Sequence, residues 1–317
     1  MGDFIEPADL RRPSRPPPPP PPAPRRRERS PSPIEYDVVF SLPESDLPEP
    51  LPSPETIENS PEIKTLMGRL TVSVGESYAV KYGIELDVIE SENMQYIREH
   101  TAIRVPKVFA VYQRINDFGS QVTYIIMERI QDETLETLWP NLSKVEKSDI
   151  AQKLRQIVNE LRALPHEGLF GSITKGPLLD SMFSSDEPSP SINGPFQSED
   201  DVRDAIVEKY AVDGGERFEQ KAKYYRRHFP QVLRGTGSPV FTHGDLQRKN
   251  VIVSSDGKIT IIDWATSGWY PSFWEYAKAI FSCGQWLDDW PDYLAIVLDE
   301  YPNHYLWINT LITDIWG

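Results

Sequence analysis

The most restrictive feature of this sequence is a polar loop that runs directly into a β-hairpin. The loop reads His-Gly-Asp at residues 243–245 and ends at Asn250, and two short apolar runs follow it, one on each side of Asp256-Gly257. An Asp-Gly pair between apolar runs is the strongest short signal of a hairpin turn. If these two residues form the turn, the register places Asn250 directly opposite Asp263. The sequence therefore predicts that an amide and a carboxylate meet at the open end of a hairpin.

The residue types at that end suit a divalent cation. Amide and carboxylate oxygens are hard ligands, which Mg²⁺ prefers, so we expect Asn250 and Asp263 to bind Mg²⁺. Asp245 lies five residues before Asn250, where it can face a metal-bound phosphate without being a metal ligand. Phosphoryl transfer needs this arrangement, because two ligands hold the metal on ATP while a separate carboxylate accepts the proton of the attacking hydroxyl.

These residues resemble a known family. His-Gly-Asp with an asparagine five residues after the aspartate, followed by Ile-Asp-Trp at 262–264, is similar to the aminoglycoside phosphotransferase and choline kinase-like family, and most of all to its fungal phosphotransferase-family members. The resemblance covers about residues 68–300. It implies an ATP- and Mg²⁺-dependent phosphotransferase that acts on a hydroxyl of a small molecule. It also implies Asp245 as catalytic base, His243 as a brace of the catalytic loop, and Asn250 and Asp263 as Mg²⁺ ligands.

The resemblance implies a two-lobed, protein-kinase-like α+β fold, and the flanking sequence agrees with it. A predicted helix at about 88–100 lies among predicted strands at about 68–74, 78–82, 107–113 and 121–127. From Leu135 the pattern changes to helices, one of which begins with a capping box of Ser143 and Glu146. We therefore expect a small antiparallel-sheet N-lobe at residues 61–130 and a larger helical C-lobe, with the catalytic loop and metal-binding hairpin, at residues 131–317.

A kinase site also needs a cation from the N-lobe, and Lys81 is the candidate. It ends an otherwise apolar predicted strand, from which it could reach the α- and β-phosphates of ATP. A carboxylate on the next helix should hold it, and Glu90 and Glu92 are both available. The family pattern of a glutamate four residues before a large apolar residue favours Glu90, which precedes Met94.

Two further residues are expected to bind the cofactor. The predicted strand that ends at Met127 leads into Glu128, and in the family this position is the hinge, whose backbone hydrogen-bonds adenine. Met127 would pack in the core and also form a wall of the adenine site.

A second interpretation is a catalytically degenerate pseudokinase that acts as a binding scaffold. No Gly-x-Gly-x-x-Gly loop precedes Lys81, since only Gly68 and Gly75 lie nearby, and the proline-rich sequence before Gly68 offers no obvious first strand. The complete set of Lys81, Asp245, Asn250 and Asp263 argues against it, because a pure scaffold needs none of these residues.

A third interpretation is a metallohydrolase with His243, Asp245 and Asp263 as ligands, because His-x-Asp pairs do bind zinc or iron. It leaves Lys81 and Asn250 unexplained. A protein kinase is disfavoured because a glycine follows His243, where that family has arginine.

The first 60 residues hold 17 of the 30 prolines, including the run 16–22 between arginines. We expect a disordered tail at 1–60, since proline lacks a backbone N–H and large apolar residues are few. Residues 36–40 could form a strand or a docking element. The proline run would form a polyproline II rod that fits the aromatic groove of an SH3-like partner, or a solvated spacer.

Composition excludes several other classes. The net charge of −15 disfavours binding to nucleic acid or to anionic membranes. It suits either a solvated acidic surface or a cationic small-molecule substrate. Cys283 is the single cysteine, which excludes a disulfide framework and a multi-cysteine metal site. No apolar run approaches the roughly 20 residues of a membrane span, and the N-terminus does not resemble a signal peptide, so a cytoplasmic protein is expected.

Overall fold

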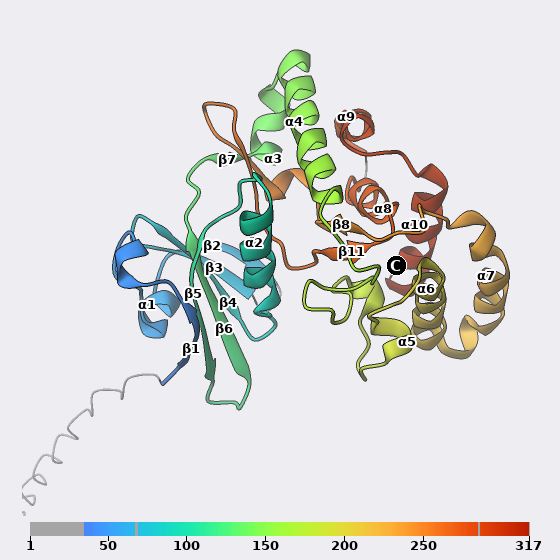
Figure 1. Ribbon diagram of the computed structural model, residues 1–317, viewed down its shortest axis with the longest axis horizontal. Helices are drawn as coiled ribbons and strands as arrows, with labels where there is room; N and C mark the ends of the chain where they lie inside the picture. Colours follow the sequence, from blue (N-terminus) through green and yellow to red (C-terminus); the bar gives the residue numbers. More distant parts are fainter. Residues whose placement is uncertain (1–34, 67–68, 285, 317) are drawn as a thin grey trace, which may run out of the picture. The chain divides into compact units, whose positions relative to one another are not determined.

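The computed structural model describes residues 35–66, 69–284 and 286–316, and residues 35–317 form one compact unit (Figure 1). The predicted polyproline rod, its SH3-like partner and Gly68 lie outside the described residues. Within them the architecture is the expected two-lobed α+β fold, with a sheet-based N-lobe and a mainly helical C-lobe.

The N-lobe is a six-stranded antiparallel sheet with the strand order β1-β5-β6-β4-β3-β2. The strands are β1 Asp37–Ser41, β2 Glu62–Leu66, β3 Arg69–Val74, β4 Tyr78–Gly83, β5 Val108–Ile115 and β6 Gln121–Glu128. Helix α2, Ile89–His100, lies along the sheet (Figure 1) and buries Met94 and Ile97 in the same core as Val111 and Ile125. This packing places the α2 residue Glu90 beside β4, which carries Lys81.

The predicted tail boundary near residue 60 is wrong. Residues 37–41 form β1, which pairs with β5, and α1, Pro54–Glu58, follows. Ile57 is fully buried, and Leu47 and Leu51 pack against the outer face of the sheet. The apolar residues between the prolines therefore have a surface to bury against, which offsets the entropy of ordering this segment. Strand β2 likewise supplies the first strand that seemed absent before Gly68 in the sequence.

The C-lobe contains most of the helices. Their bounds are α3 Leu135–Leu138, α4 Lys144–Arg162, α5 Pro190–Asn193, α6 Glu199–Gly214, α7 Glu219–Val232, α8 Trp274–Phe281, α9 Trp290–Val297 and α10 Pro302–Trp316. Both halves of the predicted capping box are present at the start of α4. Short strands connect these helices: β7 Glu133–Thr134, β8 Val240–Thr242, β9 Val251–Val253, β10 Ile259–Ile261 and β11 Gly268–Tyr270. No helix in the described part of the chain is both long and apolar enough to cross a membrane.

The hairpin of β9 and β10 exists, but its predicted register is wrong by one residue. Ile259 pairs with Val253, so the turn contains three residues rather than two. The backbone gives the reason: a two-residue type I′ turn needs a positive φ at both central residues, but Asp256 does not have one and only Gly257, at +74°, is left-handed, as at the end of a three-residue loop. In the observed register the Ile262 N–H donates to the Asn250 carbonyl at 3.0 Å, and Asp263 follows one position later.

Candidate active site

Lys81 joins the two lobes through its ammonium group. Its Nζ lies 2.9 and 2.8 Å from the two carboxylate oxygens of Glu90 and 2.8 Å from Oδ1 of Asp263. Strand β4 supplies the lysine, α2 the glutamate and the segment after β10 the aspartate. The structure therefore brings together three residues that were predicted separately.

Burial and charge act in opposite directions on this ion triad, which we define as Lys81, Glu90 and Asp263. Burial alone would lower the pKa of Lys81, but the charges of Glu90 and Asp263 outweigh it and hold that pKa above the ordinary lysine value. Burial raises the pKa of Glu90, which is 2% exposed, and Lys81 offsets only part of that rise. The cation is thus fixed in its charged form between two carboxylates.

Asp245 is held by amides of its own loop. Asn250 Nδ2 donates to Oδ2 of Asp245 at 2.8 Å and to its backbone carbonyl at 2.9 Å, and Gln247 Nε2 donates to Oδ1. Lys249 Nζ lies 3.7 Å from Oδ2. The Asp245 side chain remains 30% exposed, so an oriented carboxylate is accessible from outside the loop. A carboxylate that is oriented and accessible is suited to accept a proton.

His243 is fully committed to bracing the loop. Its Nδ1 accepts the Asp245 backbone N–H at 3.2 Å, so its Nε2 carries the proton and donates to the Ile262 carbonyl at 3.1 Å. The ring therefore links the catalytic loop to the residue before Asp263. With both nitrogens in use, His243 is not available as a metal ligand, and the described residues contain no cluster of three or more His, Cys, Asp or Glu side chains that could hold a metal ion. This geometry is against a metallohydrolase.

Glu275 anchors the same loop from α8, and the sequence analysis assigned it no role. Its carboxylate accepts the backbone N–H of His243 at 2.6 Å and that of Gly244 at 3.2 Å. Burial raises its pKa, and the His243 side chain and the two N–H groups offset part of that rise. The sequence held one signal for this role, since Glu275 is an acidic residue within the apolar start of α8. A charged side chain is rarely buried unless it has partners.

Gly244 is required by close packing. Its φ is +85°, and a Cβ there would lie 2.7 Å from Thr266 Oγ1 and 2.8 Å from the Thr266 carbonyl oxygen. Any side chain would therefore displace the segment that follows Asp263 from the catalytic loop.

The two predicted metal ligands suit a hard cation. Asn250 is fully buried and its Nδ2 is committed to Asp245, but its Oδ1 has no hydrogen-bond partner within the described chain. A buried acceptor oxygen without a partner is costly, so an oxygen-seeking ion would satisfy it. Asp263 has a φ of +67°, which non-glycine residues rarely adopt, although aspartate does so more readily than most. The donor set of these two residues thus fits Mg²⁺.

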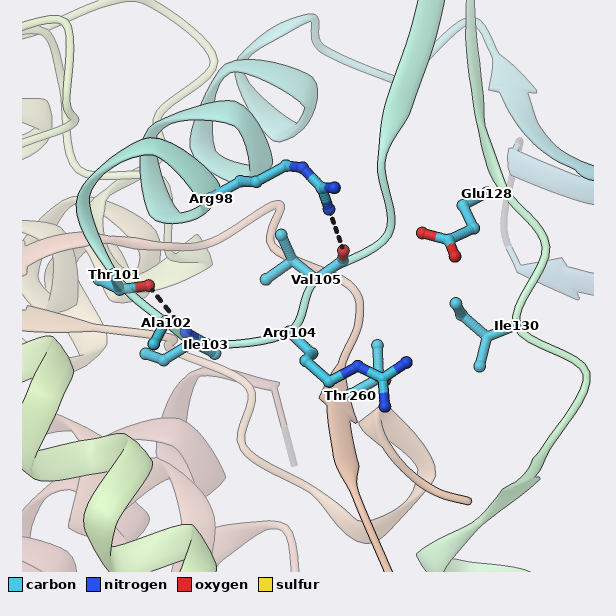
Figure 2. Close-up of a pocket in the computed structure, with 9 residues that line it drawn as sticks. All are labelled: Arg98, Thr101, Ala102, Ile103, Arg104, Val105, Glu128, Ile130 and Thr260. Atoms are coloured by element: carbon cyan, nitrogen blue, oxygen red, sulfur yellow. Dashed lines mark hydrogen bonds between the residues drawn. The ribbon is translucent and has the colours of Figure 1, made fainter. Parts of the chain in front are cut away.

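The predicted hinge lies where β6 ends. Met127 is partly buried against the main core. The N–H of Glu128 donates to the Lys107 carbonyl and that of Arg129 to the Ser77 carbonyl, both at 2.8 Å. The Glu128 carboxylate accepts the Lys107 N–H at 3.2 Å and lines a cavity of about 400 Å³ whose other walls include Arg98, at the end of α2 (Figure 2). Any hinge contact from Glu128 to a nucleotide would therefore come from its carbonyl.

The fold and these contacts define the class of protein: a two-lobed, protein-kinase-like molecule. Residues 89–307, more than half of the chain, match the phosphotransferase enzyme family, and the chain belongs to that family. The matched range includes the whole catalytic loop and excludes Lys81.

Two solved structures show the same fold at 15% sequence identity. One is the GDP and kanamycin complex of APH(2")-IIia, with a TM-score of 0.51 over 82% of each chain. The other is the GDP complex of wild-type aminoglycoside 2'-phosphotransferase-IIIa, with a TM-score of 0.52 over 79% of this chain and 82% of that one. No curated protein matches the sequence.

Proposed function

We propose that this protein is an ATP- and Mg²⁺-dependent phosphotransferase that transfers the γ-phosphate to a hydroxyl of a small molecule. One observation carries the proposal: Lys81 of the N-lobe contacts Asp263 of the C-lobe at 2.8 Å, so the candidate phosphate-binding cation lies beside the candidate metal ligand. The intact pair of Asp245 and Asn250 beside it favours a working enzyme over a pseudokinase scaffold.

Each residue has a role in this proposal. Lys81 would bind the α- and β-phosphates, oriented by Glu90. Asn250 Oδ1 and Asp263 would hold Mg²⁺, which supplies positive charge to the phosphates as negative charge develops. Asp245 would orient the acceptor hydroxyl and take its proton, and the amides of Gln247 and Asn250 keep this carboxylate in place.

The proposal also concerns which nucleotide and which acceptor the protein binds. Met127 and the Glu128 carbonyl would face the base. ATP is the expected donor, but both structural neighbours described above contain GDP, so GTP belongs in the same test. The net charge of −15 supports a cationic acceptor.

The test starts with nucleotide binding. Purified full-length protein should show a rise in unfolding temperature with ATP or GTP that grows when Mg²⁺ is added. ADP or GDP release should then be measured against amino alcohols, aminoglycosides and sugars. Failure to bind either nucleotide at millimolar concentration would exclude the proposal. Nucleotide binding without phosphorylation of any acceptor and without nucleotide hydrolysis would favour the scaffold.

A further inference from the structure

A second contact between the lobes lies one helical turn from Glu90. Asn93 of α2 is fully buried, and its Nδ2 donates to the Trp264 carbonyl at 2.8 Å and to the Ser267 carbonyl at 3.5 Å. These acceptors lie 171 and 174 positions away in the sequence. Trp264 is the residue directly after Asp263. A single amide thus ties the helix that carries Glu90 to the segment that carries the proposed metal ligand.

The same segment is tied to the catalytic loop. Ser267 Oγ donates to the His243 carbonyl at 3.0 Å, and Trp264 Nε1 donates to the Ile261 carbonyl at 2.9 Å. Asn93 therefore binds a part of the chain that is already fixed to the loop and to β10. Displacement of α2 would break the Asn93 contact and the ion triad together.

Asn93 is a poor choice for stability alone. Its Oδ1 is buried and has no hydrogen-bond partner among the described residues, so folding removes this oxygen from water without compensation. A leucine of similar size would avoid the cost of this buried oxygen, although it would remove the donor to the Trp264 carbonyl. The side chain is better explained by the position it imposes on α2.

We propose that Asn93 is a positioning residue that holds α2 against the Asp263 segment, so that the nucleotide and metal site is assembled before any ligand binds. This inference rests on the proposed function and concerns the regulation of that site. It implies that no activating modification is required to move α2 inward. The contribution of Asn93 is indirect, because it acts through Glu90 and Asp263.

The test compares Asn93→Leu with Ser91→Ala in the full-length protein. Ser91 is a matched control: it lies on the same helix and is buried, but its hydroxyl donates to Val88 within the helix and does not reach the Asp263 segment. The probe is ADP, with its affinity measured by calorimetry over a range of Mg²⁺ concentrations. Loss of the Asn93 donor should weaken Mg²⁺-dependent ADP affinity about tenfold, the equivalent of one buried hydrogen bond.

The Mg²⁺ dependence separates positioning from general stability. We expect Asn93→Leu to raise the Mg²⁺ concentration needed for half-maximal ADP affinity, while Ser91→Ala leaves it unchanged even if both lower the unfolding temperature by a few degrees, about the effect of 1 kcal/mol. Wild-type Mg²⁺ dependence in folded Asn93→Leu would overturn the inference. If that variant does not fold, Asn93→Ser carries the same test, because its hydroxyl is too short to reach Trp264. Absence of both ADP and GDP binding by the wild-type protein would instead reject the proposed function.

Discussion

The catalytic loop and the ion triad belong to one site but are built in different ways. The loop is held mainly by residues near in sequence, because Asp245 accepts hydrogen bonds from side chains two and five positions away. The buried Glu275 adds a contact with the backbone of the loop. The triad is long-range, because Lys81 meets Glu90 across nine positions and Asp263 across 182. We therefore expect the two parts to have separate roles. Changes to the loop should affect the chemical step, and changes to the triad should affect nucleotide binding and the contact between the lobes.

The largest expected effect is in the loop. Asp245→Asn removes the proton acceptor but keeps the shape of the side chain, so turnover should fall about a thousandfold while nucleotide affinity stays within about twofold of wild type. Product release and calorimetry measure the two quantities. Asp256→Asn, in the exposed hairpin turn, is the control and should change neither. A parallel loss of nucleotide affinity in Asp245→Asn would contradict the expectation that the loop and the triad have separate roles.

The next effect is in the triad. Lys81→Met leaves Glu90 buried without its cation, so the free energy of unfolding should fall by about 3 kcal/mol and nucleotide affinity should fall at least tenfold. Adding Glu90→Gln removes the unpaired charge and should restore much of the stability without restoring nucleotide affinity. Urea unfolding and calorimetry test both halves. Recovery of binding in the double variant would show that Lys81 serves stability only.

A smaller effect on stability is expected where the catalytic loop packs against the segment after Asp263. Gly244→Ala places a Cβ against Thr266, whereas Gly119→Ala has nearly the same φ, +80°, and meets nothing within 4 Å. Both variants bear the conformational cost, but Gly244→Ala should be less stable than Gly119→Ala by about 1–3 kcal/mol. Equal losses in urea unfolding would mean that the loop and the Asp263 segment can separate freely.

The same contrast explains what the sequence could predict. The proximity of Lys81 to Glu90, and of Asp245 to Asn250, could be predicted because short motifs and strand periodicity define these positions. The one-residue register error arose because Asp-Gly suits both two- and three-residue turns, which differ in whether Asp256 has a positive φ, and the sequence does not determine that angle.

Long-range contacts account for what the sequence did not reveal. Residues 37–58 are rich in proline, and no local pattern indicates that their leucines and Ile57 pack against a face of the sheet. Asn93 looks like an ordinary helical residue until its partner 171 positions away is known, and the partner of Glu275 lies 32 positions away. The adenine-facing role of Met127 and Glu128 stays a prediction.

The smallest expected effect lies away from both regions and tests whether acid sensitivity is separable from the site. His304 on α10 donates from Nε2 to the Arg234 carbonyl at 3.0 Å, and its Nδ1 is buried without a partner in the described part of the chain. Burial lowers the pKa of His304, and the Arg234 carbonyl and the charge of Glu199 offset only part of this.

The sign follows from this lowered pKa. An unfolded histidine takes up a proton near pH 6.5, which the folded site resists, so stability is fully present above that pH and is lost as the pH falls below it, by at most about 1.4 kcal/mol per pH unit. His304→Gln keeps a donor for Arg234 but cannot titrate, so its free energy of unfolding should fall less between pH 7 and 5.5 than that of the wild type. Equal losses in urea unfolding would place the acid sensitivity elsewhere.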